Sequence, residues 1–102
     1  MTKTVLHLYV SGQTTRSLTA AANLRRLCER HFNGRYELIL IDVLAHPEVA
    51  DAARILATPT TVRAEPLPMY RVIGDLSDPT KVMTALGLDV LDAGAIDGKE
   101  LS

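Results

Sequence analysis

The sequence predicts a single α/β domain with the element order strand, helix, strand, helix, strand, strand, helix. Three observations lead to this prediction. The chain has 102 residues, which is the length of one domain. Apolar residues follow a strand-like period in some segments and a helical period in others. Four of the five prolines lie between Ile55 and Pro79, where they separate two short β-type runs.

The N-terminal part predicts a strand followed by a long helix. Thr4–Val10 is rich in β-forming residues and runs into a polar turn. Thr14 or Thr15 is the expected N-cap of the helix. Across Arg16–Phe32, apolar residues recur at three- and four-residue steps, and Gly34 suits the left-handed position after such a helix. The residues expected to face the core are Leu18, Ala21, Leu24, Leu27, Cys28 and either His31 or Phe32.

The next segment, Tyr36–Leu44, is the most apolar strand candidate of the chain. A nearly continuous apolar run is typical of a parallel strand covered on both faces. With the preceding strand and helix it forms a βαβ unit, whose crossover we expect to be right-handed. A second, weaker helix is predicted over Glu48–Leu56, with Pro47 in its first turn. Its expected inward residues are Val49, Ala52, Ala53 and Leu56.

The C-terminal part predicts an antiparallel strand pair and a last helix. Thr60–Arg63 and Met69–Ile73 are separated by the proline-stiffened segment AEPLP. Asp78 and Pro79 then suit the N-cap and first position of a helix. We expect its apolar side to comprise Val82, Met83, Leu86 and Val90, with Gly87 inside the helix at a cost of about 1 kcal/mol. The polar tail over residues 92–102 is expected to fray.

This element order is that of a thioredoxin-like domain. Thr58-Pro59-Thr60 fits the same interpretation, because thioredoxin-like folds carry a cis-proline just before the third strand. Such a fold holds its redox cysteines in the first strand-to-helix turn, which here is Ser11–Thr14 and contains no thiol. Dithiol exchange needs an attacking and a resolving sulfur, whereas Cys28 is the only cysteine of the chain. The sequence therefore predicts the fold without its usual chemistry.

Composition argues against several other classes of protein. A formal net charge of −1 disfavours a general affinity for nucleic acid, and no apolar run is long enough to span a membrane. The N-terminus lacks a signal-peptide pattern, so we expect a cytoplasmic protein. His7, His31 and His46 have no ligand-like spacing, so no metal site is expected. We find no cofactor motif and no nucleophile–base pair that would support an enzyme.

Four segments carry a resemblance to a known family: LYVSGQT, YELILIDVL, ILATPT and RVIGDLSD. In these segments the sequence resembles the circadian-clock protein KaiB, over roughly Leu6 to Asp89. The combination of ILATPT and IGDLSD at this spacing is specific to that family. Because no kinase follows, we expect a free-standing KaiB-like protein rather than the related sensor domain of a clock-output histidine kinase.

The resemblance implies a non-enzymatic protein with two folds. In a thioredoxin-like state, KaiB-like proteins bind the ATPase ring of KaiC and can then recruit KaiA. In a ground state with a rearranged C-terminal half they form homo-oligomers, a tetramer or a dimer. We expect the isolated chain to favour the thioredoxin-like state, because its element order follows from the residues alone.

By motif match, the resemblance also assigns site residues. Three arginines fall at partner-binding positions of the family: Arg54, Arg63 and Arg71. Gly87 and Asp89 match a Gly-x-Asp pattern that biases the balance between the folds. Independently of the resemblance, isomerisation at Pro59 would slow interconversion to tens of seconds or longer. Basic residues that the family often has near Thr19 and Ile39 are absent, which is typical of a divergent paralogue with some ring contacts missing or relocated.

Three alternatives stay open at the level of sequence. The arginines could simply form a solvated face. The chain could be a thioredoxin-fold oxidoreductase or transferase that uses Cys28 as a single thiol, although a small core residue is the simpler interpretation of that cysteine. It could also be a stand-alone sensor domain that binds a ring without changing fold.

Overall fold

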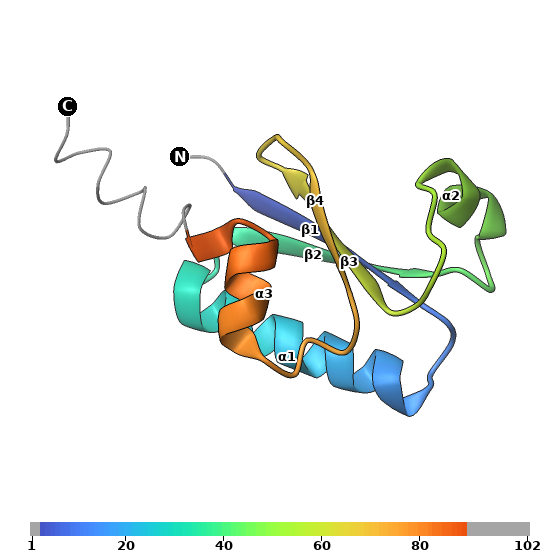
Figure 1. The fold of residues 1–102 in the computed structure, drawn as a ribbon, viewed down its shortest axis with the longest axis horizontal. Coiled ribbons are helices and arrows are strands. Elements are labelled where there is room, and N and C mark those ends of the chain that lie inside the picture. The colour runs from blue at the N-terminus through green and yellow to red at the C-terminus, as the bar shows by residue number, and fades with distance from the viewer. Residues whose placement is uncertain (1–2, 90–102) are drawn as a thin grey trace, which may run out of the picture.

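The computed structural model describes residues 3–89 and contains a four-stranded sheet with two helices packed on one face (Figure 1). The seven elements follow the predicted order. They are β1 (Thr4–Val10), α1 (Thr15–Phe32), β2 (Tyr36–Asp42), α2 (Pro47–Ala52), β3 (Thr60–Glu65), β4 (Tyr70–Ile73) and α3 (Pro79–Ala85). Val90 and the predicted tail over residues 92–102 lie outside the described residues. None of the helices in residues 3–89 is long and apolar enough to cross a membrane.

The strands lie in the order β2-β1-β3-β4. β1 is parallel to β2, with Leu6 opposite Leu38, and antiparallel to β3, with His7 opposite Val62. β4 pairs antiparallel with β3, as predicted for the proline-separated pair. Since successive side chains point to opposite faces, this register places every second residue of β1, beginning with Leu6, on the face that the helices cover.

The core lies between this face of the sheet and the helices α1 and α3. Leu6, Leu24, Leu86 and Leu88 are fully buried there. Full burial of a leucine side chain stabilises the fold by about 1.5–3 kcal/mol relative to exposure, so these side chains hold α1 and α3 on the sheet. α2 lies apart from both, beside the end of the strands (Figure 1).

The predicted helix caps are confirmed. Thr14 Oγ1 accepts a hydrogen bond from the Ser17 amide at 3.2 Å, and Asp78 Oδ1 accepts one from the Lys81 amide at 3.2 Å. Each bond satisfies an amide that has no partner within its own helix. At the other end of α1, Asn33 takes the left-handed conformation directly before Gly34.

The prediction that the second strand is covered on both faces was wrong. β2 is an edge strand, and Leu40 is 51% exposed while Ile39 is 37% exposed. The prediction that Leu18 faces the core was also wrong, because Leu18 is exposed and the neighbouring Ser17 is buried. Ser17 faces inward because its hydroxyl accepts hydrogen bonds from the Ser11 amide and the Thr14 hydroxyl.

The helix predicted over Glu48–Leu56 ends earlier, at Ala52. The Ile55 amide donates to the Ala50 carbonyl and the Arg54 amide to the Asp51 carbonyl, which is the bond pattern of a Schellman motif. Arg54 has a φ of 56° at the position that usually holds glycine. The predicted inward face was therefore wrong, since Ala50 is the buried residue of α2.

α3 also ends before its predicted end. Gly87 was expected inside the helix, but it lies after Ala85 with a φ of 65°. Its amide donates to the Thr84 carbonyl at 3.0 Å, in the last turn. Gly87 therefore ends the helix, which is the usual role of a glycine in this conformation.

Candidate functional site

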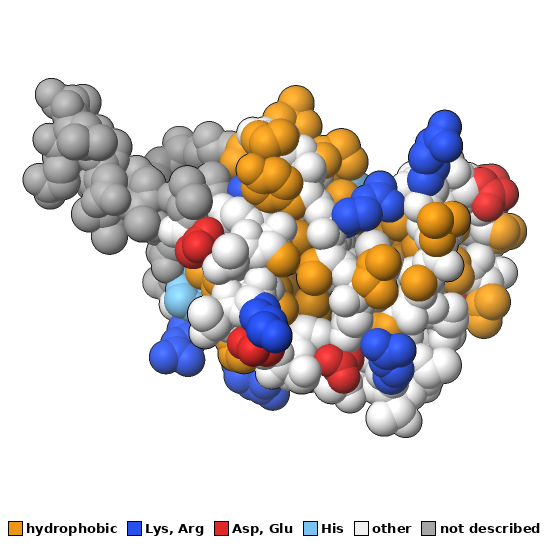
Figure 2. Space-filling model, viewed as in Figure 1, with side chains coloured by type: hydrophobic (Ala, Val, Ile, Leu, Met, Phe, Trp, Pro, Cys, Tyr) orange, Lys and Arg blue, Asp and Glu red, His pale blue; other side chains and the backbone are white. Residues whose placement is uncertain are grey.

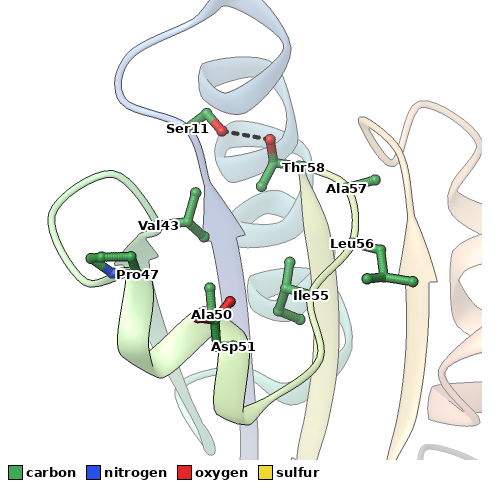
Figure 3. Close-up of a pocket in the computed structure, with 9 residues that line it drawn as sticks. All are labelled: Ser11, Val43, Pro47, Ala50, Asp51, Ile55, Leu56, Ala57 and Thr58. Carbon is green, nitrogen blue, oxygen red and sulfur yellow. Dashed lines mark hydrogen bonds between the residues drawn. The ribbon is translucent and has the colours of Figure 1, made fainter.

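The turn that carries a dithiol in a redox protein of this fold holds hydroxyl groups here. The Ser11 Oγ and Thr58 Oγ1 atoms lie 2.7 Å apart, in hydrogen-bond contact (Figure 3). Thr58 precedes Pro59, and the bond between them is cis, as predicted. Cys28 lies near the other end of α1 and is fully buried. The turn therefore keeps its position beside the cis-proline but has no sulfur for redox chemistry.

Asp42 fixes this turn against the second strand. Its Oδ1 atom accepts hydrogen bonds from the Gly12 amide at 3.0 Å and the Leu44 amide at 2.9 Å. These two bonds, the Gly12 bond first, lower the pKa of the Asp42 carboxyl. Sequence reasoning missed this residue. Asp42 is the last residue of the apolar strand β2, which runs parallel to β1. Because the carboxyl ends of parallel strands lie at the same edge of a sheet, its position in the sequence could have placed it beside the turn that follows β1.

A shallow pocket of about 300 Å³ opens beside the Ser11–Thr58 contact. We call it the Ser11–Thr58 pocket. Figure 3 shows Val43 and α2 on one side of it and the segment from Ile55 to Thr58 on the other. Its lining residues are Ser11, Val43, Pro47, Ala50, Asp51, Ile55, Leu56, Ala57 and Thr58. Its lining combines apolar side chains with the Ser11 and Thr58 hydroxyls and the Asp51 carboxylate, a mixture that is typical of binding sites.

Two of the three predicted arginines meet beside this pocket. Arg71 on β4 donates to the carbonyl of Ala53 at 2.9 Å and to the carbonyl of Arg54 at 3.1 Å. Both arginines are exposed, and Leu56, which lines the pocket, is 95% exposed. Figure 2 shows Lys and Arg side chains next to hydrophobic ones around α2. The region thus presents the positive charges of Arg54 and Arg71 beside apolar surface and the carboxylates of Glu48 and Asp51 on α2.

The third arginine, Arg63, lies in the interior and is only 3% exposed. Its guanidinium donates to the carbonyls of Gly87 at 3.2 Å and Pro68 at 2.9 Å, and it stacks on the Tyr70 ring at 4.5 Å from the centroid. Its Nε atom has no hydrogen-bond partner among the described residues. In this fold Arg63 therefore joins β3, the β3–β4 connection and the end of α3, away from the other two arginines.

The residues assigned to the fold balance lie in two places. Pro59 is buried next to the Ser11–Thr58 contact. Gly87 packs so closely on Tyr70 that an added Cβ would overlap Cε2 of the ring and lie 2.8 Å from Cδ2. Asp89, two residues further on, accepts a hydrogen bond from the Thr84 hydroxyl at 3.3 Å. Gly87 therefore lies with Arg63, Asp89 lies beside Thr84 at the end of α3, and Pro59 lies at the candidate site.

Cys28 does not have the environment of a catalytic thiol. Removal from water on burial, and secondarily the nearby Glu29 charge, raise its pKa from 9.0 to about 12. The thiolate is the reactive form, so the folded protein presents almost none of it at neutral pH. Within residues 3–89, no group of three or more His, Cys, Asp or Glu side chains could hold a metal ion.

Fold and site together define a thioredoxin-like domain without redox cysteines. Similar solved structures include the N-terminal domain of Synechococcus elongatus SasA, with a TM-score of 0.70 and 20% identity over 86% of this chain and 87% of that one. Chloroplastic thioredoxin z has a TM-score of 0.67 and 25% identity over 84% of this chain and 77% of that one. These likenesses confirm the predicted fold class.

Sequence comparison identifies the family. The KaiB domain model matches residues 7–88. The chain is 48% identical to the circadian clock oscillator protein KaiB of Synechococcus elongatus over 87 residues, which are 85% of this chain and 83% of that protein. It is 40% identical to the circadian clock protein KaiB3 of Synechocystis sp. over 92% of this chain and 90% of that protein. The chain therefore belongs to the KaiB family, which confirms the resemblance found in the sequence.

Proposed function

We propose that this protein is a cytoplasmic, non-enzymatic clock protein that binds a KaiC-type ATPase ring in its thioredoxin-like state. The observation that carries the proposal is the family match, which spans residues 7–88. The site agrees with it, because a thiol-free turn beside a shallow pocket with both polar and apolar lining residues suits protein binding. Within such a clock, KaiA or a clock-output histidine kinase are further partners to test. The proposal includes no nucleic acid, membrane or cofactor.

Arg54 and Arg71 are the residues that we propose to contact the ring. Both are exposed and positively charged beside the Ser11–Thr58 pocket, and Arg71 also holds the connection that carries Arg54. A buried charge-assisted contact at a protein interface contributes about 1.5–3 kcal/mol. Arg63, predicted with them, has its guanidinium engaged inside the fold, so we propose that it acts by positioning the hairpin.

Binding to a purified KaiC-type ring tests this proposal. Arg54→Glu is the sharpest variant, because no hydrogen bond is found for its side chain among the described residues. We expect it to weaken binding about tenfold or more, since one interfacial charge contact is worth roughly that factor. Lys81→Glu is the matched control, an equal charge change on the exposed surface of α3. Absence of wild-type binding at micromolar concentrations would refute the proposal.

A change of fold is part of the proposal and needs its own experiment. We propose that Gly87 and Asp89 bias a balance between the described fold and an oligomeric ground state, and that Pro59 affects how fast the two folds interconvert. In the described fold, the end of α3 contacts the β3–β4 hairpin, chiefly through Gly87 with Tyr70 and Arg63. Backbone chemical shifts measured across a dilution series would show a second, concentration-dependent set of signals. A single set of signals would favour a ring-binding sensor domain that keeps one fold.

The thiol alternative is the least consistent with the site. Cys28 is fully buried and its thiol pKa is raised to about 12. We therefore expect no turnover in insulin-reduction or glutathione-transfer assays. Turnover that disappears in Cys28→Ser would establish an enzyme in place of the binding protein proposed here.

A further inference from the structure

A second cavity, of about 110 Å³, lies between the later half of α1 and the connection from β4 to α3. We call it the Arg26–Arg30 pocket. Side chains of Arg26, Arg30 and His31 line it, and the buried Leu27 and Leu76 form its apolar floor. It shares no lining residue with the Ser11–Thr58 pocket. A ligand here would therefore be separate from the proposed ring contact.

Two arginines and a histidine line the pocket and no carboxylate side chain of residues 3–89 does, although Asp75 and Asp78 flank its lining residues Leu76, Ser77 and Pro79 in the chain. α1 carries four arginines and a single glutamate, although the whole chain has a net charge of −1. That glutamate, Glu29, does not line the pocket, because its Oε2 atom accepts a hydrogen bond from the Tyr36 hydroxyl at 2.6 Å. Figure 2 shows Lys, Arg and His side chains, with Asp or Glu side chains among them, on the side of the molecule where the end of α1 meets α3. An anion would find the guanidinium donors of Arg26 and Arg30, while the Asp75 carboxylate accepts a hydrogen bond from the Ser77 amide at 3.1 Å in the connection that forms the opposite wall.

The floor of the pocket depends on an unfavourable backbone conformation. Leu76 has a φ of 63°, which costs free energy for any residue with a Cβ. Glycine or asparagine would adopt it more easily but would not fill the floor, where Leu76 is 7% exposed. The Asn23 side chain donates to the Asp75 carbonyl at 2.9 Å and holds this connection against α1. Strained positions of this kind concentrate at ligand sites.

Stabilisation of α1 by positive charge at its C-terminal end explains only part of this cluster of basic residues. Arg30 and His31 lie in the last turn of α1, where positive charge interacts favourably with the helix dipole. Arg26 lies too far from the end to contribute in this way, and four-residue spacing places it beside Arg30, where like charges repel. The Arg26 guanidinium donates to the Asn23 side chain at 3.1 Å, which orients it along the pocket wall. A bound anion would offset the repulsion between the two arginines.

We propose that the Arg26–Arg30 pocket binds a small phosphate-bearing molecule from solution. Guanidinium groups present paired N–H donors that match the oxygens of a phosphate group. The volume of about 110 Å³ suits one such group rather than a large ligand. Leu27 and Leu76 form an apolar floor beneath the exposed side chains of Arg26 and Arg30.

Titration of the ¹⁵N-labelled protein with inorganic phosphate, at constant ionic strength, tests this inference. We expect saturable amide shifts at Arg26, Arg30 and Leu76, with millimolar affinity. Arg30→Gln should weaken binding about tenfold, because it removes one charge-assisted contact. Arg25→Gln is the matched control on the same helix, since Arg25 is exposed and does not line the pocket, and it should leave the affinity unchanged.

Two outcomes would overturn the inference. Shifts that grow linearly without saturation, or an equal loss in both variants, would mean that the arginines only form a solvated charged face. Flotation with phosphatidylglycerol vesicles distinguishes a lipid phosphate from a soluble one. Binding to vesicles without saturable phosphate shifts would contradict a soluble ligand.

Discussion

Arg54 combines an unfavourable backbone conformation with an exposed charge at the candidate site. Its φ of 56° lies in the region that costs a residue with a Cβ about 1–2 kcal/mol. Arg54→Gly should therefore raise the free energy of unfolding by about 1 kcal/mol, while it weakens binding to a KaiC-type ring. Urea denaturation measures the first effect and a ring-binding assay the second.

Arg25→Gly is the control, and it should lower the free energy of unfolding where Arg54→Gly raises it. Arg25 is an exposed residue inside α1, where glycine costs about 1 kcal/mol relative to a good helix former. The two substitutions remove the same side chain, so only the backbone conformation differs between them. If both variants lost stability, Arg54 would not be strained as the fold indicates.

Asp42 should make the stability of the protein depend on acidic pH. Because the pKa of its carboxyl is lowered in the folded state, its contribution to stability is complete above its usual pKa of 3.8 and is lost as the pH falls below that value. Asp42→Asn should therefore be less stable than the wild type at neutral pH, and the difference should shrink in acid. Urea denaturation over a range of pH values measures this trend. A difference that stays constant would show that the carboxylate charge is not involved.

At the scale of elements, the end of α3 depends on the contact of Gly87 with the β3–β4 hairpin. A Cβ at Gly87 would overlap the Tyr70 ring and lie 3.0 Å from the Arg63 guanidinium. Gly87→Ala should destabilise the described fold by about 2 kcal/mol, since it adds both overpacking and left-handed strain. Thermal denaturation and amide exchange in α3 and β4 would measure the loss.

The double variant Gly87→Ala/Tyr70→Ala separates the two causes. Removal of the ring relieves the overlap but leaves the φ of 65° at position 87. The second substitution should therefore cost much less in the Gly87→Ala background than in the wild type, which appears as a coupling energy of about 1 kcal/mol or more. Purely additive losses would mean that the ring and Gly87 do not contact each other.

Local chemistry made several elements predictable from sequence, and long-range contacts explain where prediction failed. The caps at Thr14 and Asp78 depend on bonds to residues three positions away, so the sequence alone indicates them. The early end of α2 could not be predicted, because Arg54 occupies the left-handed position after the helix. This position usually holds glycine, whose presence in a sequence predicts the end of a helix. The exposure of β2 depends on its place at the edge of the sheet, which its apolar composition does not reveal.

The same distinction applies to the candidate site. The pairing of the Ser11 turn with Thr58 follows from the fold class, although the two residues are 47 positions apart. The burial of Arg63 does not, because it depends on carbonyl acceptors supplied by Pro68 and Gly87. A charged side chain can be buried only where hydrogen-bond acceptors replace its hydration. The sequence around Arg63 does not indicate that Pro68 and Gly87 supply these acceptors. The family resemblance grouped Arg54, Arg63 and Arg71 together, and only the structure separates the buried Arg63 from the other two.

At the scale of the whole molecule, Cys28 reports on opening of the core. It is fully buried between α1 and the sheet, and burial raises its thiol pKa to about 12. A thiol reagent at about pH 8 should therefore react with it only through unfolding, since the thiolate is the reactive form. The labelling rate should rise exponentially with urea, with the same slope as global unfolding. A rate independent of urea would indicate a local route to the thiol and would reopen the single-thiol alternative.

The same thiol sets an alkaline limit on stability. Because its folded-state pKa lies above the usual 9.0, the contribution of the buried thiol is complete below that pH and is lost as the pH rises toward about 12. Cys28→Ala should remove this alkaline loss, at the cost of a small cavity in the core at every pH. Stability measured by urea denaturation should therefore fall more steeply with rising pH in the wild type than in the variant. Parallel pH profiles would mean that Cys28 is not held away from water and that helix α1 packs less tightly on the sheet than the fold indicates.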